Sequence, residues 1–274
     1  RTAPSGVSGA SSSNRRRPHG SEPMRTGFLL LGLSLALAGC ATVPSAEQTA
    51  EQKAARANTR LGAAYLRQGQ YEQALDRLTK AVRQDPGYAE GHSVLAVLYE
   101  RLGQHADAAR HYRRSVELAP QESSLLNNYG QFLCERGRLD EAEQYLRRAA
   151  DNPLYRTPEV PLTNAGICML RAGREQAAED YLLQALRANP SFARALLPMA
   201  ELRYRAGEPL SARGFYQRYL AVAPQTPESL WLGIQIERAL GDLDAAGSYS
   251  LLLKGRFPDS PQAQKLIESE KQNG

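Results

Sequence analysis

The chain has 274 residues, and 34 Lys and Arg residues against 29 Asp and Glu residues give it a net charge of +5. Most of this charge lies near one end, because five arginines and a single glutamate precede Cys40. The charge on the rest of the chain is mixed, so the composition does not indicate a protein that binds nucleic acid. Three cysteines and a balanced composition also argue against a fibrous or wholly disordered chain.

Residues 1–23 are rich in Ser, Arg, Pro and Gly and show no apolar periodicity. We expect them to be disordered or to lie upstream of the true start. Residues 24–39 have the pattern of an export signal, because Met24 and Arg25 are followed by an apolar run over 28–38. That run is too short to span a bilayer.

The apolar run is followed by Gly39 and Cys40, and small residues before a cysteine resemble a bacterial lipoprotein signal. The resemblance implies that Cys40 becomes the mature N-terminus and carries acyl chains, which hold the protein to lipid. The alternative is an ordinary signal cleaved near Ala38, with Cys40 incidental. Ala41, in place of Asp, resembles the outer-membrane sorting rule of this class and implies an outer-membrane location on the periplasmic side. Residues 40–54 are polar and are expected to form a lipidated tether.

A 34-residue pattern occurs six times, with two extra residues between the third and fourth copies. Position 15 is Gly and position 20 is Ala in all six copies, and position 32 is Pro in five of them. The glycine ends a first helix, the alanine lets a second helix pack closely against it, and the proline ends that second helix. The units cover residues 55–88, 89–122, 123–156, 159–192, 193–226 and 227–260, and together they span 55–260.

This pattern resembles the tetratricopeptide repeat (TPR), a helix-turn-helix unit that buries its apolar faces by stacking. The resemblance implies an all-α fold, a right-handed superhelix of six repeats. Ser260 and Pro261 favour one further helix that runs to about Glu270. Residues 261–274 are therefore expected to form a capping helix and a frayed tail.

Two parts of the repeat region depart from the pattern. Position 11 is charged in the fifth and sixth units, at Arg203 and Glu237, and position 8 of the sixth unit is Ile234 in place of a small residue. We expect the first helices of these units to pack in a shifted register or to expose more surface. Three prolines in residues 152–161 predict a longer turn between the third and fourth units.

The chain contains no set of residues with a catalytic pattern. Its four histidines include no His-Glu-x-x-His helix and no zinc spacing, and there is neither a phosphate-binding loop nor a serine elbow. We therefore expect a protein that is not an enzyme, has no cofactor or metal, and takes no small-molecule substrate. His92 is expected to pack at the start of a helix, and His105 and His111 are expected to face solvent.

Cys134 and Cys168 lie 34 residues apart, on the first helices of neighbouring units. Their repeat positions differ by two, which turns one side chain by about 200° relative to the other and allows the sulfurs to face each other across the junction. An exported protein folds in an oxidising compartment, so a disulfide is expected. Two buried free thiols are the alternative.

In TPR proteins the first helices line a groove that binds a partner polypeptide. The basic and Asn residues that clamp a peptide carboxylate in some members are not reproduced, because Thr59 and Ala63 stand where that set would begin. A helix or extended segment held through mixed contacts fits better. Trp231 has two interpretations, an anchor in the groove or a packing residue between the last two units. The expected groove residues are Arg67, Val97, Arg101, Asn127, Gln131, Ile167, Arg171, Glu201, Arg205 and Trp231.

A closer resemblance comes from four short runs, at residues 127–130 shortly before Cys134, and at 164–168, 189–190 and 229–234. Together with the lipoprotein signal and the six repeats, these runs resemble the type IV pilus biogenesis and stability lipoproteins, or pilotins. The resemblance implies that the chain binds the type IV pilus secretin subunit and promotes its multimerisation at the outer membrane. The alternative is an adaptor for outer-membrane barrel assembly or for a peptidoglycan hydrolase.

Overall fold

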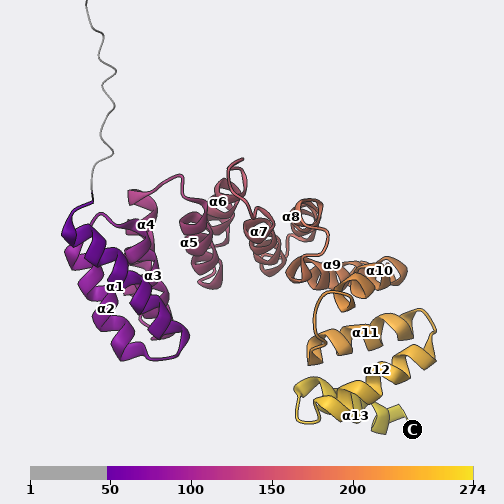
Figure 1. The fold of residues 1–274 in the computed structure, drawn as a ribbon. Coiled ribbons are helices and arrows are strands. Elements are labelled where there is room, and N and C mark those ends of the chain that lie inside the picture. The colour runs from indigo at the N-terminus through magenta and orange to yellow at the C-terminus, as the bar shows by residue number, and fades with distance from the viewer. Residues whose placement is uncertain (1–47, 274) are drawn as a thin grey trace, which may run out of the picture. The chain divides into compact units, whose positions relative to one another are not determined.

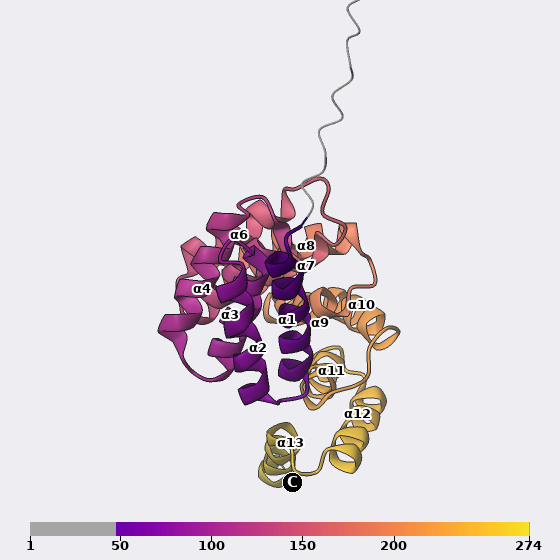
Figure 2. The same ribbon diagram turned by 60° about the vertical axis from the view of Figure 1, so that its left-hand side comes forward.

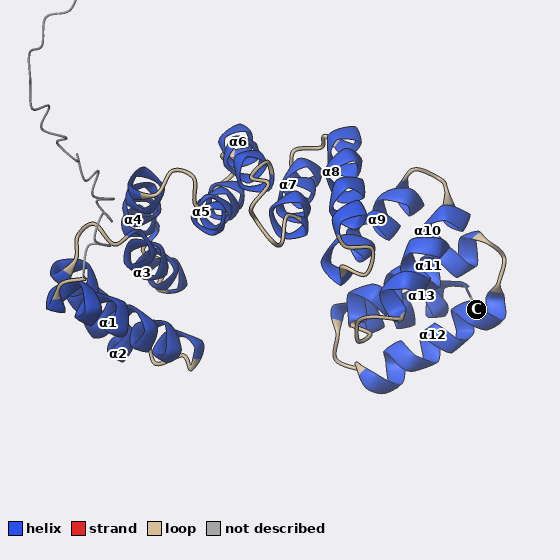
Figure 3. Cartoon of the chain, turned by 45° about the horizontal axis from the view of Figure 1, so that its top comes forward, coloured by secondary structure: helices blue, strands red, loops and turns tan. Residues whose placement is uncertain are grey.

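The computed structural model describes residues 48–273. Over this range the chain forms thirteen α-helices and no strand (Figure 3), which confirms the all-α fold. The export signal, Cys40 and most of the expected tether lie outside the described residues. None of the helices over 48–273 is both long and apolar enough to cross a membrane. The helices are α1 (Ala50–Arg67), α2 (Tyr71–Gln84), α3 (Ala89–Arg101), α4 (His105–Leu118), α5 (Ser123–Glu135), α6 (Leu139–Ala150), α7 (Glu159–Arg171), α8 (Glu175–Ala188), α9 (Ala193–Arg205), α10 (Pro209–Leu220), α11 (Pro227–Ala239), α12 (Leu243–Arg256) and α13 (Pro261–Asn273).

The helices pack as six hairpins in chain order, from α1 with α2 to α11 with α12 (Figures 1 and 2). Each hairpin packs against the next, because the second helix of one contacts the first helix of the following one. The odd-numbered helices also contact one another in sequence, and α13 packs against both α11 and α12. The first helices from α3 to α11 begin at position 1 of their expected units.

Glycine at position 15 ends each first helix. All six of these glycines have φ between 69° and 77°, a left-handed conformation that costs other residues free energy. At the first of them, the Gly69 amide donates to the carbonyl of Leu66 at 3.1 Å. The Gln70 amide donates to the carbonyl of Tyr65 at 2.9 Å, which completes a Schellman turn. The second helix begins directly afterwards, at Tyr71.

The residue at position 8 matches in size the residue at position 24 on the facing helix. Where position 8 is Gly, position 24 is Leu, and a Cβ added to Gly130 would lie only 2.7 Å from Leu146 Cγ. Where position 8 is Ala, position 24 carries the flat ring of Tyr. The sixth unit combines Ile234 with the small Ser250, and both are buried. Ile234 therefore fits without the shifted register expected from the sequence.

The charged residues at position 11 also fit the standard register, so the expected shift was wrong there too. Arg203 forms ion pairs with Glu179 and with Glu208, the latter at 3.0 Å. Glu237 is buried, and its carboxylate pairs with Arg213. The pairs with Glu179 and Arg213 cross from the preceding unit. Each charge therefore has a partner, and no surface needs to open.

The first and last helices are longer than the sequence predicted. Helix α1 begins within the expected tether, so the last part of that tether is helical. Thr49 and Gln52 form a capping box there, which starts the helix before the first repeat position. At the other end α13 continues to Asn273, past the start of the expected frayed tail. Ser260 caps α13, as predicted, by accepting a hydrogen bond from the Ala263 amide at 3.2 Å.

The longer turn between the third and fourth units consists of residues 151–158, between α6 and α7. Asn152 fixes this turn by donating from Nδ2 to Ser123 Oγ at 3.0 Å. Its Oδ1 accepts a hydrogen bond from the Leu154 amide at 3.0 Å. The first part of the turn is therefore held against the start of α5.

Candidate functional site

Three cavities open along the odd-numbered helices, and eight of the ten expected groove residues border them. The first cavity, of about 500 Å³, lies between α3 and α5. The second, of about 150 Å³, lies between α5, α7 and α9. The third, of about 370 Å³, lies between α9, α11 and α13. We name the surface of α3, α5, α7, α9 and α11 the first-helix face. The eight residues are Val97, Arg101, Gln131, Ile167, Arg171, Glu201, Arg205 and Trp231.

The first cavity contains an acidic pair that the sequence analysis did not identify. Glu100 and Glu135 adjoin each other there, and the Tyr112 hydroxyl donates to Glu100 at 2.9 Å. Burial, and to a smaller extent Glu135, raise the pKa of Glu100 above its usual value. Tyr112 and Phe132 are almost fully buried and line the cavity. Tyr112 stands at a core position of the repeat, so the repeat pattern gave no signal that its side chain borders a cavity.

Asn127, expected in the groove, is instead part of the packing between helices, since only 6% of it is exposed. Its Oδ1 accepts a hydrogen bond from Asn164 Nδ2 at 2.8 Å. Asn164 Oδ1 accepts in turn from Arg194 at 3.0 Å. Asn127 thus joins α5 to α7 and does not reach the open surface. Arg171 and Arg194 border the second cavity, so positive charge gathers there.

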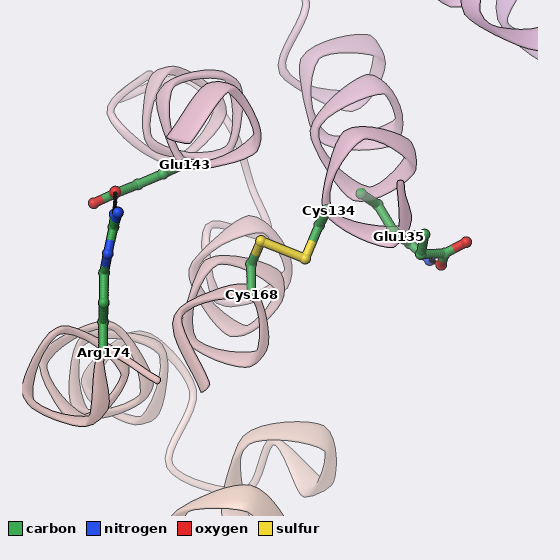
Figure 4. Close-up of a disulfide and its surroundings, with 6 residues drawn as sticks. Cys134, Glu135, Glu143, Cys168 and Arg174 are labelled. Atoms are coloured by element: carbon green, nitrogen blue, oxygen red, sulfur yellow. Dashed lines mark hydrogen bonds and ion pairs between the residues drawn. A yellow bond between two sulfur atoms is a disulfide. The ribbon is translucent and has the colours of Figure 1, made fainter. Parts of the chain in front are cut away.

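A disulfide joins Cys134 of α5 to Cys168 of α7 beside the second cavity (Figure 4). The two Cα atoms are 5.7 Å apart, within the range that disulfides span. Both residues are buried. Figure 4 also shows Arg174 of the fourth repeat paired with Glu143 of the third, at 3.6 Å. The junction between these two repeats is therefore held by a covalent bond and by an ion pair.

Trp231 packs against residues of the sixth repeat and α13, not between the last two repeats as the packing interpretation expected. Its ring packs against the buried cluster that contains Leu230 and Leu266, and it also borders the third cavity. Lys265 Nζ lies 5.1 Å from the ring centroid, a cation–π contact. Arg67, the remaining expected groove residue, is exposed at the end of α1.

His92 and His111 form a pair inside the second repeat. Their Nδ1 atoms lie 2.9 Å apart and their ring centroids 5.2 Å apart. Burial lowers the pKa of both rings, and the neighbouring His92 helps to lower that of His111 to about 4. The prediction that His111 faces solvent was wrong, because it stacks on His92 and on Tyr99. His105 is exposed, as predicted.

The first-helix face changes its chemistry from one cavity to the next. The first cavity combines a pair of glutamates with two arginines and two aromatic rings, the second carries arginines and amides, and the third contains Trp231 with charged side chains of both signs. This alternation suits a polypeptide that presents several kinds of side chain. In the part of the chain that the structure describes, no group of three His, Cys, Asp or Glu side chains is placed to hold a metal ion.

Comparison with known families agrees with the architecture. The tetratricopeptide repeat model matches residues 44–89, 59–123, 93–155, 169–227 and 197–261. These matches cover most of the chain, including five helical hairpins in full and the fourth hairpin from residue 169 onward. The hairpins and the first-helix face are thus those of a TPR protein.

Two relatives show which group of TPR proteins this chain resembles. The type IV pilus assembly protein PilF of Pseudomonas aeruginosa is 33% identical over 242 residues, which cover 87% of this chain and 96% of PilF. A solved structure of P. aeruginosa PilF has a TM-score of 0.74 and covers 81% of this chain and 100% of its own. PilW, a type IV pilus biogenesis factor, is 32% identical with a TM-score of 0.72, over 78% of this chain and 98% of its own. The chain therefore belongs to the tetratricopeptide repeat family and, within it, to the type IV pilus biogenesis proteins that include PilF and PilW.

Proposed function

We propose that this protein is an outer-membrane lipoprotein of the pilotin type, which binds the type IV pilus secretin subunit and promotes its assembly into multimers. A role in type IV pilus biogenesis is supported by PilF and PilW, which are a type IV pilus assembly protein and a type IV pilus biogenesis factor. The secretin as partner and the lipid anchor go beyond those relatives. Each is supported by a separate feature of the chain.

The anchor is supported by the sequence before the described residues. The apolar run over 28–38 is followed by Gly39 and Cys40, and Ala41 stands at the position that governs sorting in this class. Each methylene of an acyl chain on Cys40 would contribute about 0.8 kcal/mol on burial in lipid. Several chains would therefore keep the protein at the periplasmic side of the outer membrane.

The observation that carries the binding role is the arrangement of three cavities along one face of consecutive repeats. A helix or an extended segment of a secretin subunit that lies along this face would contact several repeats at once. An anchor at Cys40 would then hold the bound subunit at the membrane. The resulting rise in local subunit concentration favours multimers over free subunits.

The anchor is tested by Cys40→Ser in cells that assemble pili. The variant is expected to leave the outer-membrane fraction, to lose labelling by palmitate, and to lower the amount of secretin multimers that resist detergent. The level of the variant itself is followed by immunoblot as a control. Normal multimers in cells whose Cys40→Ser protein is no longer in the membrane would contradict the proposal.

The binding face is tested by Ile167→Glu, because Ile167 borders the second cavity and is half-buried. Leu210→Glu is the matched control, since Leu210 lies on α10 with 71% of its surface exposed. We expect Ile167→Glu to reduce co-purification of the secretin from solubilised envelopes and Leu210→Glu to leave it unchanged. Capture of a barrel-assembly protein or a peptidoglycan hydrolase in place of the secretin would overturn the proposal in favour of an adaptor.

A further inference from the structure

Glu100 and Glu135 both line the first cavity. Glu100 extends from α3 and Glu135 from the end of α5, and their carboxyl groups interact with each other. Arg101 and Arg136 line the same cavity and are exposed, as Glu135 is, and the charge of Arg136 acts to lower the pKa of Glu100. Over residues 48–273, no ion pair includes either of the two glutamates.

Among the described residues, the hydrogen bonds to these two carboxyl groups come from neutral donors. The Tyr112 hydroxyl donates to Glu100 at 2.9 Å, and Gln131 Nε2 donates to Glu135 at 3.2 Å. A hydrogen bond from a neutral donor is about half as strong as one from a cation. The repulsion between the carboxylates is therefore only partly offset, in keeping with the raised pKa of Glu100.

The walls of the cavity are aromatic. Tyr112 and Phe132 are 2% and 3% exposed, and their ring centroids are 5.0 Å apart. Aromatic faces attract cations, and arginine more often than lysine. Val97 adds an apolar side chain to the lining, and a volume of about 500 Å³ has room for a whole long side chain. The cavity thus offers apolar contact for a methylene stem and negative charge for its end.

We infer that the first cavity binds a basic side chain of the partner polypeptide, with its charged group between Glu100 and Glu135 and its stem against Tyr112 and Phe132. This inference rests on the proposed function only in taking the partner to be a polypeptide on the first-helix face. Arginine fits better than lysine, because its planar guanidinium bonds to two carboxylates at once. The carboxylates, the aromatic walls and the volume all favour the same ligand.

The test uses N-acetyl-arginine amide as the probe, with N-acetyl-citrulline amide as a control of nearly equal shape but no charge. Saturation-transfer NMR on the full chain in detergent follows binding through the methylene protons of each probe. Arginine amide should receive saturation and citrulline amide little or none. Equal transfer to both probes, or no transfer to either, would overturn the inference.

Glu100→Gln with Glu135→Gln should weaken arginine-amide binding by about tenfold or more, because two charge-assisted hydrogen bonds are lost. Glu268→Gln is the matched control, since Glu268 is exposed on α13 and borders none of the three cavities, and it should bind the probe normally. The double variant should remain folded by circular dichroism, because it removes a repulsion between like charges. Unchanged probe binding in the folded double variant would count against the cavity.

Secretin co-purification separates this inference from the proposed function. If the unsubstituted protein captures no secretin, the proposed function fails. The saturation-transfer experiment with arginine amide still tests the inference. If the secretin binds equally to the unsubstituted protein and to the double variant, the inference fails and the proposed function stands. We expect the unsubstituted protein to bind both arginine amide and the secretin, and the double variant to bind neither.

Discussion

Arg203 of α9 forms an ion pair with Glu179 of α8, across the junction between the fourth and fifth repeats. The side chains are 20% and 21% exposed, so the pair is largely shielded from water. One repeat further along, the same two repeat positions carry Glu237 and Arg213, which pair with the charges exchanged. The junction between repeats therefore accepts either polarity, provided that both members change together.

Exchanging the charges of Arg203 and Glu179 should give an ion pair like that of Glu237 and Arg213 at the next junction. Arg203→Glu alone opposes two carboxylates and should lower the free energy of unfolding by about 2 to 3 kcal/mol. Combining it with Glu179→Arg should restore most of that loss. The introduced guanidinium would also reach Glu208, just as Arg213 reaches Asp242 at 3.3 Å. Urea unfolding of the three variants measures the coupling, and a double variant no more stable than the worse single one would contradict it.

Gly130→Ala should destabilise the protein, because Gly130 lets α5 and α6 approach closely. An added Cβ would lie 2.7 Å from Leu146 Cγ and 3.2 Å from the carbonyl oxygen of Ala142. Leu146 is fully buried and cannot move without disturbing the core. We expect a loss of about 1 to 3 kcal/mol in the free energy of unfolding, measured in urea. Adding Leu146→Tyr should recover part of it, since units with Ala at position 8 carry Tyr at position 24.

Gly214→Ala is the matched control for this prediction. Gly214 lies inside α10, and an added Cβ would meet no atom within 4 Å. Alanine favours a helix over glycine, so this variant should gain about 0.5 to 1 kcal/mol. If the free energy of unfolding falls for Gly130→Ala and rises for Gly214→Ala, the effect of close packing is separated from that of helix propensity. A gain at Gly130 as well would show that the close approach to Leu146 has no energetic weight.

Reduction of the disulfide should weaken the middle of the stack. Cys134 and Cys168 are separated by 34 residues, and closing a loop of that length stabilises the folded chain by about 4 kcal/mol in the chain-entropy account. A reductant should lower the free energy of unfolding of the unsubstituted protein by about that amount. The variant with both cysteines replaced by Ser should not respond to the reductant and should match the reduced protein. Equal stability of the oxidised and reduced forms would contradict the prediction.

The period of the repeats predicted the helix boundaries, because glycine at position 15 and proline at position 32 act on their own local backbone. Contacts between different helices were not predictable in the same way. Arg203 looked unsuitable for its position until Glu179, one helix earlier, was placed beside it. Ile234 likewise looked too large until Ser250 was found at the facing position. In both cases one position departs from the pattern and a distant one compensates.

In the candidate site, too, the repeat period predicted local features but not the contacts between helices. The periodicity of the first helices predicted which positions line the first-helix face, and Val97 and Ile167 do border its cavities. The period did not show that Glu100 and Glu135 meet, because they occupy different repeat positions and approach only through the packing of α3 on α5. Asn127 was misplaced because its carbonyl oxygen turns to Asn164 on the next helix.

His111 should make stability depend on pH. Burial, and then the neighbouring His92, lower its pKa from 6.5 to about 4. Between those values the unfolded chain binds more protons, so the free energy of unfolding should fall as the pH drops from about 6.5 towards 4. His111 is half-buried, which limits the loss to about 2 kcal/mol. His111→Phe retains a ring to stack on Tyr99 and removes the titration, so its stability should fall less over this range. Equal pH slopes, or a His111 pKa near 6.5 by NMR, would contradict the prediction.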